Sequence, residues 1–350
     1  DAATSQPLIR IPYDPGVRLG RQEVQSSISG LSPALTALLL VGVLLLALLF
    51  VASYVGGLHS PKPYGAKLAV VGPPAAVEQL SAEIERAIPG IDPRASGSVA
   101  DARRQIDEGR VFGALILGEQ RDRLLVSQTW NRGFSTQVAQ GFRRAFAAQG
   151  RPLAVEVVEP LPEQDANGLS PFYLVVGWVV GGYLAAVVLG LARGERATSV
   201  AAAGARLGAL AGYAIVAGLL GALLVDPVMS ILEGHFLALW GIGTLIVFAT
   251  AAATLAFESL LGVLGVGLAI ALFVVLGNPA SGAIFPPELL PQPWRAMGGY
   301  ITTGAGGQAV RSVQYFDGAV LLRPMLVLMV YALAGSAIVV LVGFRASRRS

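Results

Sequence analysis

Cysteine is absent from the 350-residue sequence, and histidine occurs only as His59 and His235. The chain therefore cannot form a disulfide bond or bind a metal through thiolates, and it lacks the H-E-x-x-H pattern of zinc enzymes. We expect His59 at a membrane interface and His235 in a solvated loop, with a metal or proton-relay role as the alternative for His235. No G-x-S-x-G nucleophile motif is present either. The sequence thus predicts no catalytic residue, no cofactor and no metal site, and an enzyme is the least favoured function class.

Lysine is almost absent too, since Lys62 and Lys67 are the only two. Neither follows a glycine-rich G-x-x-x-x-G-K-[ST] loop, so the chain does not bind ATP through a P-loop. The net charge of +3 is small, and no basic stripe with interleaved aromatic residues occurs. These observations argue against a nucleic acid partner.

Charged residues of either sign are scarce, at 13% of the sequence against 54% hydrophobic residues. Soluble domains carry about a quarter charged residues. The existing charges are concentrated between His59 and Ser170, and long stretches outside this window are nearly uncharged. The pattern predicts a lipid-embedded chain with one water-facing domain.

Six segments have the composition and length of transmembrane helices, which need about 20 apolar residues to cross about 30 Å of hydrocarbon. They are Leu35–Tyr54, Phe172–Ala192, Leu207–Val225, Phe236–Phe257, Ser259–Gly277 and Met325–Phe344. The fold class predicted is a polytopic α-helical membrane protein with six transmembrane helices and a small extracytoplasmic α/β domain between the first and second. The corresponding division of the chain is an N-terminal segment 1–34, a first span 35–55, the α/β domain 56–170, five further spans within 171–344 and a tail 345–350.

Arginines in the short loops predict the orientation of these spans. Three arginine groups fall on one side of the membrane if the chain crosses it six times, and the positive-inside rule makes that side cytoplasmic. The groups are Arg10, Arg18 and Arg21; Arg193, Arg196 and Arg206; and Arg345, Arg348 and Arg349. We therefore expect a multi-pass protein of the cell membrane with both termini in the cytoplasm.

Acidic residues are expected at the ends of the spans, where Asp226, Glu233 and Glu258 fall, with a deeper position as the alternative for Glu258, which lies between two long spans. Carboxylates buried within a membrane mark ion or proton pathways. Their absence from the predicted spans argues against a transporter driven by protons or sodium.

In the region expected to face water, the spacing of apolar residues alternates between that of a strand and that of a helix. Alternating or continuous apolar runs predict strands, and apolar residues at helical spacing predict amphipathic helices. The predicted strands are Lys67–Gly72, Val111–Leu117, Arg123–Ser127 and Ala154–Val158, and the predicted helices are Ala75–Ile88, Ser98–Glu108 and Phe134–Ala148. Strands that alternate with helices predict an α/β domain.

Two further features concern the helices. Gly177 and Gly181 lie four residues apart, as do Gly208 and Gly212, and such spacing lets helices approach closely, either in a dimer seam or within one subunit. The segment 279–317 is rich in glycine and proline but poor in charge, although it would lie outside. Non-helical backbone at membrane depth must be buried in protein or line a cavity. We therefore expect an external re-entrant or interface-lying hairpin there.

The same segment contains a residue pattern that is similar to that of a known protein family. The chain resembles membrane proteins of the YhgE/Pip (phage infection protein) type, which are related to the permeases of type-2 ABC exporters. The resemblance rests on one span, an external domain and five spans, together with the pattern Asn278-Pro279-x-Ser281-Gly282-x-x-x-Pro286-x-Glu288-x-Leu290-Pro291, Gly304-Ala305, Arg311 and Tyr315-Phe316-Asp317-Gly318.

The resemblance implies roles for particular residues. A cytoplasmic loop that contacts a separate ATPase would contain Arg193, Glu195, Arg196 and Arg206. The external hairpin would be shaped by Ser281, Gly282, Pro286, Glu288, Pro291, Arg311 and Asp317. A short interfacial helix before the first span would lie at Arg18–Gly30.

These observations lead to two function hypotheses of different classes. The first is the permease subunit of an ABC-type exporter for an amphipathic or hydrophobic substrate, energised by a separate cytoplasmic ATPase and forming a homodimer or heterodimer. The second is a non-transporting membrane scaffold or receptor whose external domain binds a partner. A neighbouring ATPase gene would favour the first hypothesis, and purification with an external partner but no ATPase would favour the second.

Overall fold

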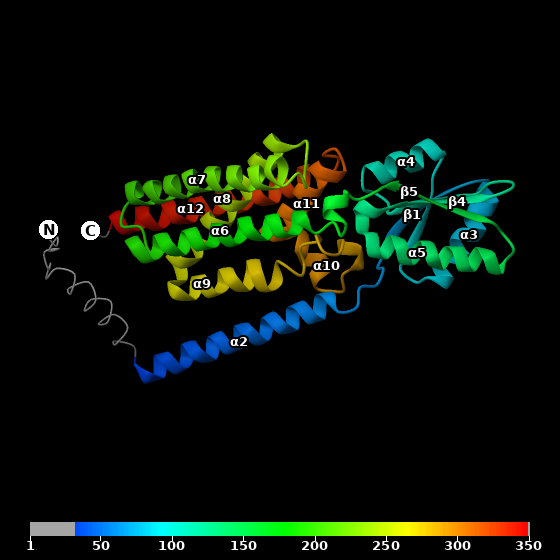
Figure 1. The fold of residues 1–350 in the computed structure, drawn as a ribbon. Helices are drawn as coiled ribbons and strands as arrows, with labels where there is room; N and C mark the ends of the chain where they lie inside the picture. Colours follow the sequence, from blue (N-terminus) through cyan, green and yellow to red (C-terminus); the bar gives the residue numbers. More distant parts are fainter. Residues whose placement is uncertain (1–31, 349–350) are drawn as a thin grey trace, which may run out of the picture. The chain divides into compact units, whose positions relative to one another are not determined.

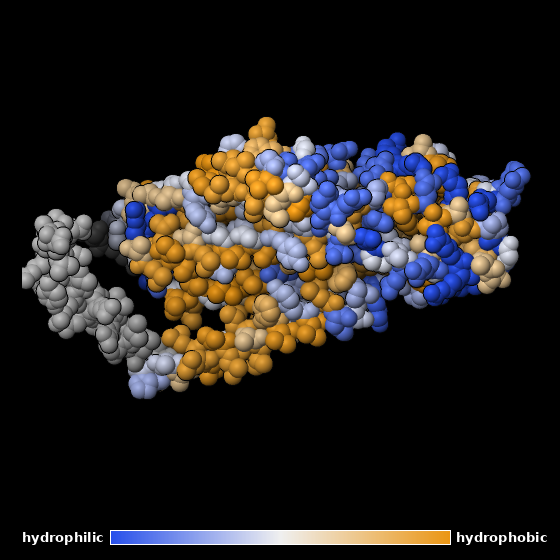
Figure 2. All heavy atoms as spheres, viewed as in Figure 1, coloured by the Kyte–Doolittle hydropathy of each residue, from blue (hydrophilic) through white to orange (hydrophobic). Residues whose placement is uncertain are grey.

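The computed structural model describes residues 32–348, which form long apolar helices and an α/β domain. Within these residues five helices are long and apolar enough to cross a membrane (Figure 1). They are α2 (Pro33–Leu58), α6 (Ser170–Arg193), α7 (Val200–Leu223), α8 (Phe236–Leu261) and α12 (Leu322–Ser347). Figure 2 shows hydrophobic residues gathered over the helices and hydrophilic residues over the α/β domain. These features are those of a helical membrane protein.

Helix α2 has no charged residue in its 26 positions. The chain divides into two compact structural units within this helix. The boundary lies between Leu48 and Leu49, and the second unit contains the rest of α2 and every later element. The interfacial helix expected at Arg18–Gly30, most of the segment 1–34 and residue Arg349 lie outside the described residues.

The fifth expected span, Ser259–Gly277, has a different form. Helix α8 continues through Glu258 to Leu261 and ends at Gly262, whose φ of 63° few other residues adopt. The chain then forms α9 (Val263–Ala269) and a π-helical continuation, η3 (Ile270–Leu276), of seven residues each. At 1.5 Å per residue these cover about 21 Å, less than the roughly 30 Å of a bilayer core. The apolar run predicts a full helix, but Gly262 divides it between two elements.

Helix α8 is the centre of the helical domain, which we define as residues 170–347. It packs against α6, α7, α11 and α12. Small residues permit these approaches. A Cβ added at Gly182 of α6 would lie 2.7 Å from the Val247 carbonyl oxygen, and one at Gly335 of α12 would lie 2.6 Å from the Ala252 carbonyl carbon. Helix α7 continues into a π-helical turn, η2 (Leu224–Val228), before the chain turns back to α8.

The α/β domain contains a five-stranded sheet with strand order β2-β1-β3-β4-β5. Its strands are β1 (Ala66–Val71), β2 (Ile91–Ala95), β3 (Gly113–Ile116), β4 (Asp122–Ser127) and β5 (Leu153–Glu159). All neighbouring pairs are parallel except β3 and β4, where Ala114 pairs with Leu125. Because the connection from β3 to β4 is short, only an antiparallel pairing is possible there.

Helices cover both faces of this sheet. Helices α3 (Pro74–Ala87) and α5 (Gln128–Ala148) share one apolar cluster with residues such as Leu68 and Leu115. Helix α4 (Val99–Asp107) packs on the other face through Ala102 and Ile106. Every strand and helix expected from the periodicity coincides with one of these elements. Strand β2 was not expected because Pro93 interrupts its short apolar pattern, and such a residue is tolerated only where its missing N–H is not needed, as at a sheet edge.

The segment 279–317 lies largely inside the protein. It contains two 3-10 turns, η4 (Pro287–Leu289) and η5 (Gly298–Tyr300), and two α-helices, α10 (Trp294–Met297) and α11 (Thr302–Tyr315). Residues 277–283 are non-helical and buried, and α11 is buried along most of its length. The residues before α6 add a 3-10 turn, η1 (Glu163–Asp165).

Candidate functional site

The loop between α6 and α7, at residues 194–199, was expected to dock a partner. Arg193, Glu195 and Arg196 are exposed, but Arg206 on the first turns of α7 is only 3% exposed. The Nη2 group of Arg206 donates hydrogen bonds to the carbonyl oxygens of Arg193 (2.6 Å) and Arg196 (3.2 Å). Arg206 therefore stabilises the loop from the buried side. Only Arg193, Glu195 and Arg196 are exposed to a partner.

The same loop is fastened to the end of α8. The Nε group of Arg196 donates to the carbonyl oxygen of Ser259 at 2.9 Å. The carboxylate of Glu195 lies close to Gly262, where an added Cβ would be 2.8 Å from its Oε2 atom. The loop and the end of the central helix thus form one packed unit, which we call the inner junction.

Glu258 lies in this inner junction, within one turn of the end of α8, and it is buried there. It is 2% exposed, and neither carboxylate oxygen has a hydrogen-bond partner within residues 32–348. Gly190 of α6 makes room for it, because an added Cβ there would be 2.5 Å from Oε2. The Nη1 group of Arg206 is likewise buried and unpartnered within the described chain. A buried carboxylate therefore lies near a buried guanidinium without bonding to it.

A second buried arginine lies where α11 meets the α/β domain. Arg311 is 9% exposed, and its Nη2 group donates to the carbonyl oxygens of Thr129 (2.5 Å) and Trp130 (3.0 Å) at the start of α5. Its guanidinium also lies 5.4 Å from the centre of the Tyr315 ring. Burial lowers the pKa of Arg311, and the nearby Tyr315 and Asp165 oppose that shift.

We define the outer junction as Arg311, Tyr315, Asp165 and the start of α5. Asp165 connects it to α6. Its carboxylate accepts hydrogen bonds from the backbone N–H groups of Leu169 and Ser170, where α6 begins. The Tyr315 hydroxyl donates to Asp165 Oδ2 at 3.4 Å, and burial raises the pKa of Tyr315. The junction thus links α5, α6 and α11 through bonded groups.

Other contacts join the α/β domain to the segment 279–317. The side-chain amide of Asn131, at a non-helical position within α5, donates to the Ile284 carbonyl oxygen at 3.1 Å. The backbone N–H of Tyr64 donates to the Glu288 carbonyl oxygen at 2.7 Å. Trp294 lies against Gly56 near the end of α2 and donates to Ser53 Oγ at 3.0 Å.

The remaining hairpin residues named from the sequence shape the backbone. Ser281 is buried, and its hydroxyl accepts from the Ala283 N–H. Gly282 has a φ of 73°, and Asp317 has a φ of 45°. Pro286 precedes η4, and Pro291 lies shortly after it.

An acidic cluster lies at the edge of the outer junction. Glu159 at the end of β5 is hydrogen-bonded to Asp107 and lies near Asp317. Burial raises the pKa of Glu159, and the two neighbouring carboxylates raise it further. Among residues 32–348 no group of three or more metal-ligating side chains is arranged to hold a metal ion. His59, the residue after α2, bonds the carbonyl oxygen of Val55 in that helix.

Three of the four glycines singled out from the sequence do not lie at a helix crossing within the described chain. Gly177, Gly208 and Gly212 have open space where a Cβ would be added, and at Gly181 the Tyr213 hydroxyl would lie 3.0 Å away. The crossings use other glycines, such as Gly182 and Gly335. In the sequence these glycines look like the exposed ones. Only the packing of the helices distinguishes the two groups.

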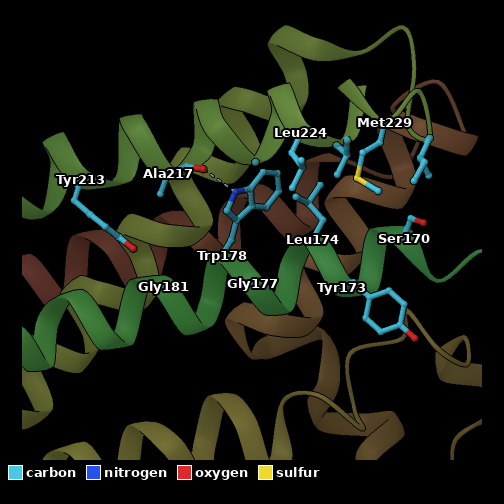
Figure 3. A pocket seen from close by; sticks show the side chains of 13 residues that line it. Ser170, Tyr173, Leu174, Gly177, Trp178, Gly181, Tyr213, Ala217, Leu224 and Met229 are labelled. Atoms are coloured by element: carbon cyan, nitrogen blue, oxygen red, sulfur yellow. Dashed lines mark hydrogen bonds between the residues drawn. The ribbon is translucent and has the colours of Figure 1, made fainter. Parts of the chain in front are cut away.

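A groove of about 410 Å³ lies between α6 and α7. Figure 3 shows Trp178 pointing from α6 toward α7, where its indole N–H donates to the Ala217 carbonyl oxygen at 3.1 Å. Gly221 of α7 and Gly243 of α8 leave room for this indole, since an added Cβ at either would be 2.3–2.4 Å from its atoms. Sequence reasoning missed the groove, and it gave a deeper position of Glu258 only as an alternative.

The described residues define a helical membrane protein with an α/β domain fastened to its helices. Comparison with protein-family models, curated proteins and solved structures finds no match to this chain. The resemblance to YhgE/Pip-type proteins therefore stays a prediction.

Proposed function

We propose that this chain is the membrane-spanning subunit of an exporter for an amphipathic or hydrophobic substrate, energised by a separate cytoplasmic ATPase. The observation that carries the proposal is the inner junction. An exposed charged loop is held by Arg206 of α7 and is bonded through Arg196 to the Ser259 carbonyl oxygen near the end of α8, the most buried of the candidate spans. A partner that moved this loop would move the central helix, because closely packed elements shift as units and not by gradual deformation.

The proposed topology has six crossings, with both termini in the cytoplasm of the cell and the α/β domain outside. The segment from Val263 to Leu276 is too short to cross alone, but the buried non-helical residues 277–283 extend it. Immediately afterwards the carbonyl oxygens of Ile284 and Glu288 bond the α/β domain. Irregular backbone is stable at membrane depth when protein surrounds it, which supports a sixth crossing that is only partly helical.

The substrate class follows from the character of the helices. The described spans carry few ionisable groups, and the groove between α6 and α7 is lined mainly by apolar side chains. Such surfaces do not solvate an ion, but they accommodate apolar chains. Glu258 is the exception, and we assign it to the inner junction and not to an ion pathway because it lies within one turn of the end of α8.

The topology can be tested in a chain that naturally lacks cysteine. Thr198→Cys and Glu119→Cys place single thiols at exposed positions in the inner loop and in the α/β domain. An impermeant reagent added to intact cells should label only Glu119→Cys. Labelling of Thr198→Cys from outside would reject the orientation.

The coupling proposal is tested with a charge reversal on the loop. Arg193→Glu changes an exposed side chain, and Arg345→Glu is the matched control at an exposed position on α12. We expect Arg193→Glu to reduce recovery of a co-expressed ATPase and substrate-stimulated ATP hydrolysis, while Arg345→Glu leaves both unchanged. Charges at the edge of a protein–protein interface mainly set the orientation of the two partners and the rate at which they associate. Transport by the purified chain in liposomes without any ATPase would overturn the proposal, and recovery with an external partner alone would favour a scaffold.

A further inference from the structure

The groove between α6 and α7 has the size of a binding site. Its volume of about 410 Å³ falls within the range of ligand pockets, about 300–1,000 Å³. Its floor includes Gly177, where no atom of the described chain lies within 4 Å of an added Cβ. Leu224 and Met229 form part of the wall, and both are about half exposed. The groove is therefore open to whatever surrounds the helices.

The length of the groove matches half of a membrane. On α6 it extends from Ser170 to Gly181, which at 1.5 Å per residue is about 16 Å. The hydrocarbon core is about 30 Å thick, so the groove covers roughly the depth of one leaflet. Tyr213 reaches from α7 toward Gly181 and limits the groove there (Figure 3). A helix of a second copy would need a longer seam, whereas one acyl chain needs no more than this.

A polar cleft lies near the open end of the groove. Its volume is about 350 Å³, and it is lined by Arg132, four side-chain amides and Thr136, with no acidic residue. The amides belong to Asn131, Gln137, Gln140 and Asn167. Asn167 of the cleft and Ser170 of the groove are three residues apart, which separates their Cα atoms by at most about 11 Å.

The lining of the cleft indicates the charge of its ligand. Arg132 is exposed, and its Nη1 group donates to the Ala166 carbonyl oxygen at 2.6 Å, so its guanidinium is held beside Asn167 with other N–H donors available. A cation surrounded by amides without a carboxylate favours an anionic, oxygen-rich group.

We propose that the groove and the cleft together bind one molecule of a lipid-like amphiphile, with an acyl chain between α6 and α7 and an anionic headgroup beside Arg132. The assignment of this molecule as cargo rests on the proposed exporter function, but binding itself does not. The site is assembled by one chain and requires neither nucleotide nor an ATPase.

The test uses the full chain in vesicles without an ATPase. The probe is phosphatidylglycerol with a diazirine on one acyl chain, and phosphatidylcholine with the same chain is the neutral comparison. We expect labelling of peptides from the first half of α6 and the second half of α7 that unlabelled phosphatidylglycerol displaces. Gly177→Leu, which fills the groove, should reduce this labelling about tenfold, the effect of losing about 1.4 kcal/mol of binding. Gly208→Leu, at an equally open glycine outside the groove, is the control and should label as the wild type does.

The headgroup contact is tested separately. Arg132→Gln should abolish the preference for phosphatidylglycerol over phosphatidylcholine, and Arg143→Gln on the same helix should retain it. Labelling that cannot be displaced and is spread over all spans would show ordinary surrounding lipid and would overturn the proposal. So would a crosslink between two copies through Gly177→Cys that abolishes labelling, because a second copy would then occupy the groove. Labelling that succeeds while ATPase-dependent transport fails would reject the exporter and leave the binding site standing.

Discussion

Two buried arginines hold the two ends of the helical domain, and their surroundings differ. Arg311 at the outer junction bonds two carbonyl oxygens, lies over Tyr315 and has Asp165 nearby, and Asp165 is itself bonded to the start of α6. Arg206 at the inner junction also bonds two carbonyl oxygens, but its Nη1 group has no partner in the described chain. The nearby carboxylate of Glu258 has none either.

The difference separates a junction whose charged groups are bonded from one that keeps unpartnered charged groups. Groups at the outer junction are bonded, so any displacement there breaks existing interactions. At the inner junction Arg206 Nη1 and the Glu258 carboxylate have no hydrogen-bond partner within the described chain, so no bond of these groups resists a displacement. The inner junction is also where the proposed ATPase would act.

The largest expected effect is that of Arg311→Met. The substitution leaves the carbonyl oxygens of Thr129 and Trp130 without their charged donor, and each such bond contributes about 1.5–3 kcal/mol. We expect a loss of about 3–5 kcal/mol of stability, measured as thermal unfolding in detergent. Arg143→Met, at an exposed position of α5, is the control. An unchanged midpoint would contradict the view of a fixed outer junction.

A smaller loss is expected for Arg206→Met. The carbonyl oxygens of Arg193 and Arg196 again lose a donor, but the substitution also removes a buried Nη1 group that has no partner. The two effects partly cancel, so we expect a loss of about 1–2 kcal/mol. A loss equal to that of Arg311→Met in the same unfolding assay would remove the distinction between the junctions.

Glu258→Gln should act in the opposite direction. It keeps the side-chain shape while removing an ionisable carboxyl group that is buried without a hydrogen bond, and a charge there is unfavourable in a protein interior. We expect stability to increase by about 1 kcal/mol in the same assay, comparable to one unpaired buried group. A marked loss would show that the Glu258 charge is already compensated in the folded protein.

The smallest effect concerns pH at the edge of the outer junction. The pKa of Glu159 is raised by burial and by Asp107 and Asp317. The folded state therefore binds this proton more tightly than the unfolded state, and stability falls as pH rises from about 4.3, the ordinary glutamate pKa, through the raised value. Glu159→Gln should raise the thermal midpoint at pH 7 and leave it nearly unchanged at pH 4.

Glu156 on the same strand supplies the opposite control. Hydrogen bonds from Arg123 and Arg103 lower its pKa, so its ionised form stabilises the folded state above about pH 4.3 and this contribution is lost as pH falls through the lowered value. Glu156→Gln should lower the midpoint at pH 7. Shifts of the same sign for both variants would contradict the assigned causes.

Much of the architecture was predictable because it depends on local pattern. A run of about 20 apolar residues favours a membrane whatever its neighbours are, so α2, α6, α7, α8 and α12 appear where hydropathy indicates long helices. The α/β elements other than β2 follow from spacing in the same way. The segment from Ser259 to Gly277 shows the limit of this reasoning, because hydropathy is blind to the break that Gly262 introduces.

The sequence by itself therefore determined which segments are apolar helices and which part of the chain forms the α/β domain, since both follow from the chemistry of neighbouring residues. Only the tertiary structure decided which charges are exposed and which are buried. Arg193 and Arg206 belong to one predicted loop, yet one faces outward and the other bonds carbonyl oxygens beneath it. Glu258 is buried because Gly190 of another helix leaves room for it. Burial and partner choice depend on residues that are distant in the chain, and no local pattern contains that information.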